Sequence, residues 1–396
     1  MQALSLRFLL WLVIASLVIT GLSLAQSVSY TVVPINSVFD PPGRVLPGDI
    51  NNHRAVAATD LLSGRPHMGF IWRPGKSTPL PTLGGTCSAA LGISDGGHVV
   101  GSSCVPGDAT FHAFLYRKHQ IEDIDTFGGV ASYANRVNEN NQVTGVFTTS
   151  DGVAHGFFWH GKHWSDLGSL GGSATLVNGL SESGLVTGQS DISNDPDPVF
   201  GIPHFHGFTW SNGVLTDLGQ IFGSDFGYTV GADAAGRIAG ASDLAGDLSG
   251  HAYLWDHGTV TDLSPYDFVT AWSNDINSQG DIIGSWGSND NDPADGPPVY
   301  TILCPCFGVL WHNGVPLFLN DLVGDPQWQF LLGLWINDRG DIVAAGSLNG
   351  GPLQRVLLKR IVVAAPAKEN SSPLPVQSSM PRGFHRERDG EITVLP

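Results

Sequence analysis

Short apolar runs that end in an aromatic residue recur along the chain, separated by polar, glycine-rich segments. They occupy residues 69–72, 112–116, 155–159, 206–210, 251–255 and 307–311, with a degenerate seventh copy at 355–358. From Trp72 to Leu358, consecutive copies are about 48 residues apart on average. Runs of this length are typical of short strands, and a period of roughly 40 to 50 residues is typical of propeller blades.

A turn precedes each apolar run and repeats with it. Its first residue has a short polar side chain: Asn51, Ser94, Asn138, Ser181, Asp233, Asn277 and Asn337. Three residues later stand Arg54, Gly97, Asn141, Gly184, Gly236, Gly280 and Gly340. A polar cap followed by glycine or asparagine in the left-handed conformation is what a tight hairpin requires. A strand of small residues follows each turn, and an Asp-Leu-Gly element follows each aromatic strand, at residues 82–85, 125–129, 166–168, 217–219, 262–263 and 321–322.

Four short strands per repeat predict an all-β fold, a seven-bladed β-propeller of four-stranded antiparallel blades. We expect the second strand, which is rich in glycine and alanine, to lie near the crowded central axis. Residues 29–35 supply a fourth strand with no third strand before it, and residues 355–359 supply a third strand with no fourth after it. Pairing of the N-terminal strand with the C-terminal blade therefore closes the ring and removes its open edges. An open β-solenoid is the alternative, but it does not explain these complementary ends.

The two ends of the chain differ from the repeats. Residues 1–25 have the features of a signal peptide, with Arg7 before an uncharged apolar run at 8–24 and small residues at the cleavage site. An uncleaved membrane anchor is the alternative, because the run approaches the length that spans a bilayer. We assign residues 26–363 to the propeller and 364–396, rich in proline and serine, to a flexible tail. The protein is therefore expected to be secreted, extracellular or periplasmic, without a stable membrane span after cleavage.

The composition narrows the range of partners. The chain has 51 glycines, only 19 Lys and Arg against 36 Asp and Glu, and a formal net charge of −17. Few charges and many glycines suit short strands joined by turns. Nucleic acid and anionic lipid surfaces are bound through clustered Lys and Arg, so we expect neither as a partner. A monomer is expected.

Four copies of the aromatic strand begin with the same triplet, as His112-Ala113-Phe114, His155-Gly156-Phe157, His206-Gly207-Phe208 and His251-Ala252-Tyr253. With the Asp-Leu-Gly and Asn-x-x-Gly elements between them, they resemble the HAF-repeat family of extracellular repeat proteins. The resemblance spans roughly residues 30–359, and the first, sixth and seventh copies lack the histidine. It implies export and a propeller-like fold, without implying an established reaction.

The repeated histidines share one place in the blade, so we interpret them as copies of a structural hydrogen bond. His204 and His206 lie near the acidic segment that contains Asp191, Asp195 and Asp197. Histidines two residues apart on an extended segment point the same way, and with a carboxylate they can ligate a metal. His206 is also the repeat histidine, which makes the structural role the stronger interpretation.

Residues 92–96 match the G-x-S-x-G pattern of a nucleophile elbow, which requires a strand-to-helix turn in an α/β sheet. Ser94 instead occupies the repeated turn position. We therefore interpret it as a turn cap and assign no catalytic residue.

Two insertions, at residues 191–203 and 287–306, separate the second and third strands of their blades. Connections after the second and fourth strands emerge on one face, and binding residues concentrate on such loops. The candidate ligand-binding residues are therefore Asp191, Asp195, Asp197, His204, Asp290, Asp292 and Asp295. The last three form a candidate calcium site. However, Ala294 breaks the EF-hand spacing, and a solvated acidic loop is the stronger interpretation. No other cofactor is predicted.

The four cysteines form two pairs. If Ser94 pairs with Gly97 across the turn, Cys87 faces Cys104, and export favours a disulfide between them unless a bulge shifts the register. A disulfide between Cys304 and Cys306 would close over one residue and be strained. A reduced pair, a soft-metal site and a bond to another chain remain open for these two.

These observations favour a secreted or surface-associated propeller that acts as a binding or scaffold module. Its ligand is an extracellular glycan or protein, and the sequence does not choose between them. The alternative is a propeller-fold extracellular glycosidase or polysaccharide lyase. Such an enzyme would carry two carboxyl groups about 5 to 9.5 Å apart at the mouth of the central channel. Two inward carboxyl groups with raised pKa at that mouth would favour the enzyme.

Overall fold

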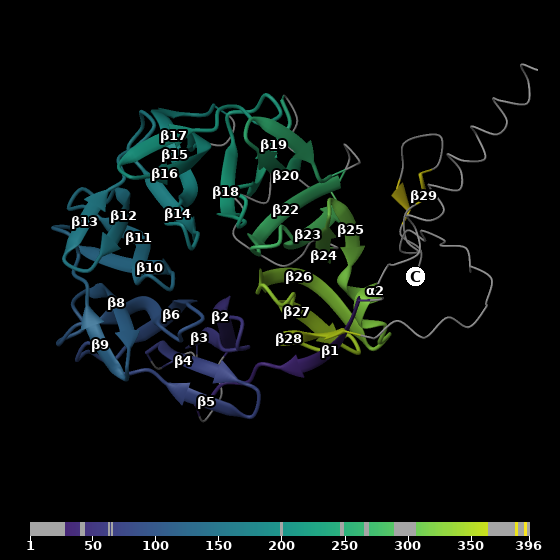
Figure 1. Ribbon diagram of the computed structural model, residues 1–396, viewed down its shortest axis with the longest axis horizontal. Helices are drawn as coiled ribbons and strands as arrows, with labels where there is room; N and C mark the ends of the chain where they lie inside the picture. Colours follow the sequence, from purple (N-terminus) through teal and green to yellow (C-terminus); the bar gives the residue numbers. More distant parts are fainter. Residues whose placement is uncertain are drawn as a thin grey trace, which may run out of the picture. The chain divides into compact units, whose positions relative to one another are not determined.

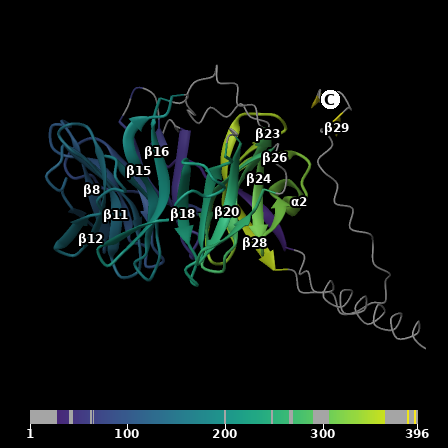
Figure 2. The ribbon, with the colours of Figure 1, turned by 90° about the horizontal axis from the view of Figure 1, so that it is seen from above.

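The computed structural model describes residues 28–39, 44–61, 64, 66–198, 201–245, 249–264, 269–288, 306–362, 385–386 and 392–393. Within these residues, seven four-stranded antiparallel sheets surround a central axis (Figure 1). Seen edge-on, the strands of each blade run between the two faces of the ring (Figure 2). The fold is the seven-bladed β-propeller that the repeats predict.

The blades follow one another in chain order. Blades 1 and 2 contain β2 (Arg44–Ile50), β3 (Val56–Leu61), β4 (Met68–Arg73), β5 (Lys76–Pro79), β6 (Ser88–Ile93), β7 (Val99–Cys104), β8 (Phe111–Arg117) and β9 (Gln120–Asp123). Blades 3 and 4 contain β10 (Ala131–Val137), β11 (Gln142–Thr148), β12 (Ala154–His160), β13 (His163–Asp166), β14 (Thr175–Leu180), β15 (Val186–Pro196), β16 (Pro203–Ser211) and β17 (Val214–Asp217). Blades 5 and 6 contain β18 (Gly227–Ala232), β19 (Ile238–Asp243), β20 (Gly250–Asp256), β21 (Thr259–Asp262), β22 (Val269–Ile276), β23 (Ile282–Ser288), β24 (Phe307–His312) and β25 (Val315–Phe318). Blade 7 contains β26 (Trp328–Ile336), β27 (Ile342–Leu348), β28 (Leu353–Val362) and, as its fourth strand, β1 (Val28–Pro34).

The first strand of each blade is the innermost one (Figure 1). The prediction that the small-residue second strand lies at the axis is therefore wrong: this strand lies one place further out. Its small residues have another cause, which is close contact with the inner strand. A side chain at Gly101 or Gly284 would bring its Cβ within 1.9 Å of a carbonyl oxygen of that strand.

The turn between the first and second strands has the geometry that the sequence predicts in all seven blades. The residue three places after the turn residue has a positive φ in every copy, including Arg54 at 59° and Asn141 at 58°. Several turn side chains also bond to the next blade: the Nδ2 atoms of Asn51, Asn138, Asn277 and Asn337 each donate to the carbonyl of the next turn residue, at 2.9 to 3.1 Å. These turns define the turn face of the ring, and the opposite side is called the loop face.

Every inner strand carries a β-bulge three residues before the turn residue. In blades 3, 4 and 6 the bulge residue is an asparagine whose amide donates to a carbonyl of the next blade, at 2.6 to 2.9 Å. Bulge and turn thus form two levels of hydrogen bonds between neighbouring blades.

Apolar residues fill the spaces between the blades. In one such core, Ala57 and Ile71 of blade 1 pack with Ile93, Val99 and Phe114 of blade 2, and all five are buried. Burial of this kind between successive blades is the main source of the free energy of folding in such a ring.

The Asp-Leu-Gly element after the aromatic strand was expected to form the fourth strand of the blade. In blades 3 to 5 its aspartate ends that strand, because Asp166, Asp217 and Asp262 pair with the aromatic residue of the third strand. In blades 1, 2 and 6 the prediction is wrong. The equivalent residues are Pro79, Asp123 and Phe318, whereas the motifs at 82–85 and 125–129 lie in the following loops. Asp321 lies in the short helix α2 (Leu319–Val323). The recurrent Leu-Gly residues therefore lie in the loop after the fourth strand and not in the strand itself.

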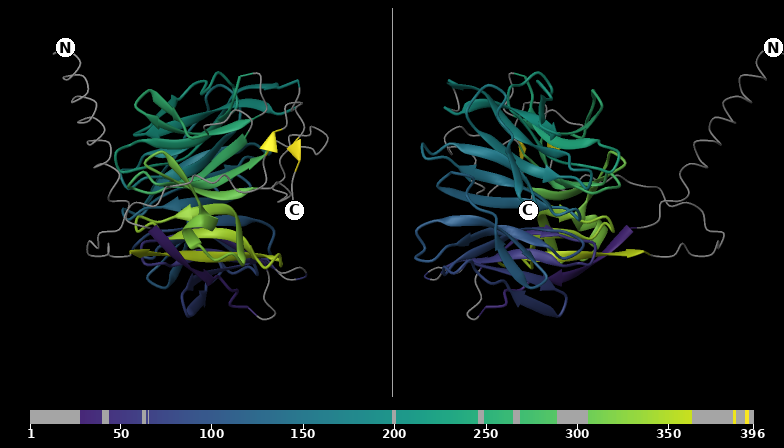
Figure 3. Two further views of the ribbon diagram at one scale, coloured as in Figure 1. Left: turned by 90° about the vertical axis from the view of Figure 1, so that its right-hand side faces the viewer. Right: turned by 60° about the vertical axis from the view of Figure 1, so that its left-hand side comes forward.

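The ring closes where the two ends of the propeller meet. Strand β1 lies beside β28 and completes blade 7, as the sequence predicts (Figure 3). The backbone amide of Ile35 extends the contact by donating to the carbonyl of Arg355 at 2.9 Å. Tyr30 of β1 is buried in the core of blade 7. This closing strand therefore contributes core packing as well as backbone hydrogen bonds.

The propeller forms one compact unit, residues 28–361. The predicted signal peptide lies outside the described residues. Of the predicted tail, the structure describes a pair of two-residue antiparallel strands, β29 (His385–Arg386) and β30 (Ile392–Thr393). In the part of the chain that is described, no helix has the length and hydrophobicity to cross a membrane.

Candidate functional site

The four repeated histidines make the same contact in blades 2 to 5. The Nδ1 atom lies 2.9 Å from a carboxylate oxygen of the fourth strand in each of the pairs His112–Asp123, His155–Asp166, His206–Asp217 and His251–Asp262. Each aspartate also accepts a backbone N–H two residues ahead, at 2.7 to 2.9 Å. The histidines are therefore structural, as interpreted from the sequence.

The predicted residues of the first insertion are only partly brought together. Asp191 lies in the middle of the second strand of blade 4, β15, where its Oδ2 accepts the N–H of Ala174 at 3.1 Å. Burial raises the pKa of Asp191, and this hydrogen bond opposes the shift. Asp195 is exposed within β15. Most of the predicted loop is thus a longer strand that does not gather these carboxylates.

Asp197 and His204 do meet, with Nε2 of His204 3.1 Å from Oδ2 of Asp197. The next blade supplies a partner that the sequence did not reveal. Oδ2 of Asp225 lies 3.5 Å from Nδ1 of His204, and its Oδ1 lies 3.3 Å from Nε2 of His206. Carboxylates and imidazoles therefore alternate from Asp197 to Asp217.

This chain of hydrogen bonds does not form a metal site. The imidazole nitrogens point at carboxylate oxygens and not at a common centre. In the described part of the chain no three His, Cys, Asp or Glu side chains are grouped so as to hold a metal ion. The candidate calcium ligands Asp290, Asp292 and Asp295 lie outside the described residues.

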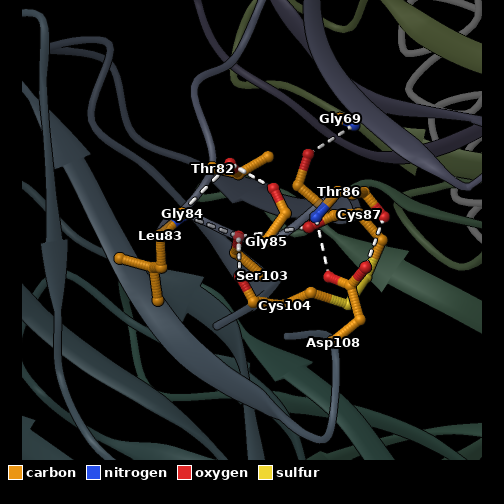
Figure 4. The surroundings of a disulfide bond; sticks show 11 residues. Gly69, Thr82, Leu83, Gly84, Gly85, Thr86, Cys87, Ser103, Cys104 and Asp108 are labelled. Atoms are coloured by element: carbon orange, nitrogen blue, oxygen red, sulfur yellow. Dashed lines mark hydrogen bonds between the residues drawn. A yellow bond between two sulfur atoms is a disulfide. The ribbon is translucent and has the colours of Figure 1, made fainter. Parts of the chain in front are cut away.

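The cysteine prediction for blade 2 is confirmed (Figure 4). Cys87 and Cys104 form a disulfide with a Cα–Cα distance of 5.2 Å at the loop-face end of the inner hairpin. Around it, Asp108 accepts the N–H and the hydroxyl of Thr86 at 2.8 Å each, and Ser103 accepts the N–H of Leu83 at 2.9 Å. Cys306 is disulfide-bonded as well, and Cys304 lies outside the described residues.

Ser94 has the role of a turn residue, as expected. Its carbonyl accepts the N–H of Gly97 and the amide of Asn51. These contacts fit a turn cap and not a nucleophile elbow.

Each inner strand also has a residue facing the central axis, two positions before the turn residue. Three of these residues are glycines, but four are Asp49, Arg136, Asp275 and Trp335. Arg136 of blade 3 reaches Trp335 of blade 7, on the opposite side of the axis, and its Cζ lies 4.6 Å from the ring centroid. Trp335 is fixed by its Nε1–H, which donates to the carbonyl of Pro47 at 3.1 Å. A cation–π contact therefore crosses the axis near the turn face.

Two carboxyl groups flank this contact. Asp49 accepts the N–H of Ile50 at 2.8 Å and of Ile93 in the next blade at 3.1 Å. Asp275 accepts the N–H of Ile336 in blade 7 at 2.9 Å. Both residues are partly exposed, while protein encloses their carboxyl groups. The two aspartates thus connect neighbouring blades from within the axis.

Burial dominates the titration of both groups. It raises the pKa of Asp275 to about 7. The positive charge of Arg136 opposes this shift, and the negative charge of Asp49 adds to it. Burial likewise raises the pKa of Asp49, with Arg136 again opposing it. Asp49 and Asp275 thus have the raised pKa that the enzyme alternative expects of two inward carboxyl groups. Their backbone hydrogen bonds, however, give each of them a structural role.

A further ring of side chains lies three residues closer to the loop face, about 10 Å along the strands. It consists of Leu46, Ala89, Tyr133, Leu176, Tyr228, Trp272 and Leu332, all of which are partly exposed. In blades 2 to 6 this residue stands between two buried neighbours of the same strand. The pattern places six of these side chains at the axis, where solvent reaches them. Trp272 is the exception, because its Nε1 lies 3.2 Å from the Cβ position of Gly250 and its indole therefore turns towards blade 5. The other six are called the axial ring.

The turn-face end of the axis is acidic. Asp95, Glu139, Glu182 and Asp338 each follow a turn residue. Burial raises the pKa of Glu182, and the charges of the other three carboxylates add to the shift. Asn52 bridges two of the four through bonds of 2.6 and 2.9 Å to Asp95 and Asp338. The axis therefore has an acidic end at the turn face and an apolar, aromatic ring towards the loop face.

Sequence reasoning missed the axial residues because it compared what the repeats share. The signal was present as a departure from the repeat, since Asp49, Arg136, Asp275 and Trp335 stand where other blades have glycine. Aligning the blades on the turn residue and reading the outliers at each position would have found them.

Among solved structures, the chain is similar to the β-propeller domain of the Trilobed protease from Pyrococcus furiosus, which has an open velcro topology. The identity is 9%, the TM-score is 0.53, and the match covers 82% of this chain and all of that domain. It is also similar to YCF48 bound to D1 peptide, with 11% identity, a TM-score of 0.46 and coverage of 86% and 97%. The first similarity supports the propeller fold and nothing further. No family model matches the sequence, and no curated protein matches it.

Proposed function

We propose that the protein is an exported β-propeller that binds an extracellular ligand at the loop-face end of its axis. The observation that carries the proposal is the axial ring, which includes the partly exposed Tyr133 and Tyr228. Ligand sites are typically lined by apolar and aromatic side chains with a few polar groups that set orientation. Here Arg136, Asp49 and Asp275 supply such groups deeper in the axis.

Export is supported by the disulfide between Cys87 and Cys104, since disulfides persist in oxidising compartments. The apolar N-terminal run and the resemblance to HAF repeats agree with export, and membership of that family is part of the proposal. A binding or scaffold role fits a site in which both axial aspartates accept backbone hydrogen bonds.

One observation favours the second candidate, a glycosidase or polysaccharide lyase: Asp49 and Asp275 are axial carboxyl groups with raised pKa. A carboxyl group with a pKa near 7 is suited to general acid or base catalysis. Because each already accepts backbone N–H groups, we rank binding above turnover.

The test is an array of glycans and extracellular peptides probed with the purified full-length mature protein, with and without a chelator. We expect retention of a defined glycan class that does not depend on the chelator. Every retained glycan is then incubated with the protein, and the products are separated. Intact glycan supports a binding module. Cleavage that is lost in Asp275→Asn supports the enzyme, and an array without any signal contradicts both candidates.

A further inference from the structure

Arg355 breaks the repeat at a position where every other blade has a small residue. The pairing of the second and third strands aligns it with Gly69, Ala113, Gly156, Gly207, Ala252 and Gly308. A side chain at these glycines would press on the following blade: the Cβ at Gly69 would lie 3.0 Å from the backbone nitrogen of Ala90, and that at Gly308 2.7 Å from Leu319. Only blade 7 accommodates a large cation here.

The side chain of Arg355 faces blade 1, across the seam where the ring closes. Along β28, Val356 and Leu358 pack in the core within blade 7 and towards blade 6, whereas Leu357 packs with Val45 and Phe70 of blade 1. Because side chains alternate along a strand, Arg355 shares the side of Leu357. It lies near the loop-face end of its strand, as does Arg44, the exposed first residue of the inner strand of blade 1.

The two cations at the seam have no counter-charge among the described residues. The Nε of Arg355 is buried without a hydrogen-bond partner, and the described part of the chain offers neither guanidinium an acidic group within 4 Å. Burial lowers the pKa of Arg355, and the positive charge of Arg44 lowers it further. Two arginines whose charges repel each other, one of them largely buried, are unfavourable unless an anion compensates them, and the described residues supply none.

We propose that Arg355 and Arg44 form an anion site at the seam between blades 7 and 1, and that it takes the carboxylate or sulfate group of an acidic sugar chain. Guanidinium groups match the planar oxygens of such anions with paired hydrogen bonds. The inference rests on the proposed function and names the ligand class for the same end of the axis.

The distribution of charged and aromatic side chains favours an acidic sugar chain as the ligand of the seam and the axial ring. The negative faces of aromatic rings attract the weakly positive C–H groups of a pyranose, and Tyr133 and Tyr228 offer such faces in the axial ring. Blades 2 to 5 carry acidic side chains towards the loop face, among them Asp108, Asp191, Asp197 and Asp225. They repel an anion, as does the acidic turn-face end. An acidic chain is therefore directed to the seam, and its sugar rings to the axial ring.

The experiment measures the affinity of the full-length mature protein for three oligosaccharides of equal length: an oligouronate, a sulfated neutral-sugar oligomer and the unsulfated oligomer. Arg355→Ala introduces the residue found in blades 2 and 5, so the fold is expected to tolerate it. Arg44→Ala removes the second cation. Lys359→Ala is the matched control, since it removes an exposed positive charge from the same strand.

We expect at least one acidic oligomer to bind more tightly than the neutral one. Arg355→Ala should weaken that binding by about tenfold or more, and Arg44→Ala by a smaller factor. Lys359→Ala should leave it within about twofold, and added salt should weaken it. Arg355→Lys keeps the positive charge but loses the paired N–H donors of the guanidinium, so its affinity should lie between those of Arg355→Ala and the wild type. Melting curves establish that each variant is folded.

Different results overturn the two proposals. If the neutral oligomer binds as tightly as the acidic ones, or if Arg355→Ala changes no affinity, the anion site is wrong and ligand binding at the axis still stands. If acidic peptides bind at Arg355 and no saccharide does, the ligand class is wrong. If no glycan or peptide probe binds wild-type protein, the proposed function itself fails.

Discussion

The guanidinium of Arg136 on blade 3 lies 4.6 Å from the indole centroid of Trp335 on blade 7, so one contact joins opposite sides of the ring. The cores and the turn and bulge hydrogen bonds described above join neighbouring blades. Closure at β1 and β28 and this contact across the axis both oppose opening of the ring. The contact also supplies the positive charge that opposes the rise in pKa of Asp49 and Asp275.

Removal of this charge is expected to destabilise the propeller. Arg136→Met keeps an apolar stem and loses the cation, so the free energy of unfolding should fall by about 1 to 2 kcal/mol. A double-mutant cycle with Trp335→Leu in denaturant unfolding measures the coupling. Arg117→Met, which breaks a solvent-exposed ion pair with Glu122, is the control and should cost less than about 1 kcal/mol. Equal costs for the two arginines would contradict the contact across the axis.

The raised pKa of Asp275 predicts a pH dependence of stability. In the folded state it binds its proton up to about pH 7, whereas in the unfolded chain it releases it near pH 4. The folded state therefore holds more protons between these values, and the free energy of unfolding falls as the pH rises from about 4 to 7. Asp49 contributes with the same sign.

Asp275→Asn isolates this group, because it keeps an oxygen acceptor for the N–H of Ile336. We expect the variant to lose part of the decline between pH 5 and 8 and to exceed the wild type by about 1 to 2 kcal/mol at pH 8. Urea unfolding at several pH values measures the difference. Parallel curves for the two proteins would show that Asp275 ionises normally.

Loss of the disulfide in blade 2 is expected to cost about 3 kcal/mol, because a bridge over 17 residues restricts the unfolded chain. The double variant Cys87→Ser, Cys104→Ser should show this loss without a reductant. In a reductant, the difference between variant and wild type should shrink. Titration of thiols in the native wild type should find neither of these two cysteines free, and labelling of either one would contradict the pairing.

The repeated histidines should affect stability and not binding. His251 is completely buried, whereas the side chain of His155 is 30% exposed. His251→Ala is therefore expected to cost about 2 to 3 kcal/mol and His155→Ala about 1 kcal/mol. Thermal unfolding measures the costs, and affinity for the array ligand should stay within about twofold in both. A loss of affinity in a folded His155→Ala variant would indicate a functional histidine.

The ring, the number of blades, the turns and the closing strand were predicted from the sequence, because each depends on residue types that recur in the repeats. A left-handed turn position, for example, is visible as glycine in most copies. The strand at the axis could not be identified in this way. Small residues occur wherever backbones approach closely, and here the approach is between the first and second strands and not at the axis.

The disulfide illustrates a correct prediction with an incomplete reason. In the turn of blade 2, Ser94 bonds to two residues: its carbonyl accepts the N–H of Gly97, and its amide donates to the carbonyl of His98. The strand register therefore follows the pair Ser94 and His98, one residue away from the predicted pair Ser94 and Gly97. A bulge at Leu91 then shifts the pairing by one residue and brings Cys87 opposite Cys104. Without the bulge, the cysteines would be out of register.

The candidate site was the least predictable part. Asp197 and His204 bond to each other, but their neighbour Asp225 comes from another blade. Arg136 and Trp335 are about 200 residues apart in the sequence. Contacts across a ring depend on the number of blades and on the direction of each inner strand, and neither is visible within one repeat. Residues that depart from the repeat consensus are the practical guide to such sites.

The affinity of one pair of aromatic variants within blade 3 tests ligand binding at the axis most directly. Tyr133 belongs to the axial ring, and Trp164 is exposed on the outermost strand of the same blade. For a glycan retained on the array, Tyr133→Ala should raise Kd by about tenfold or more, while Trp164→Ala leaves it within about twofold. Unchanged affinity in a folded Tyr133→Ala variant, or a larger loss in Trp164→Ala, would contradict binding at the axis.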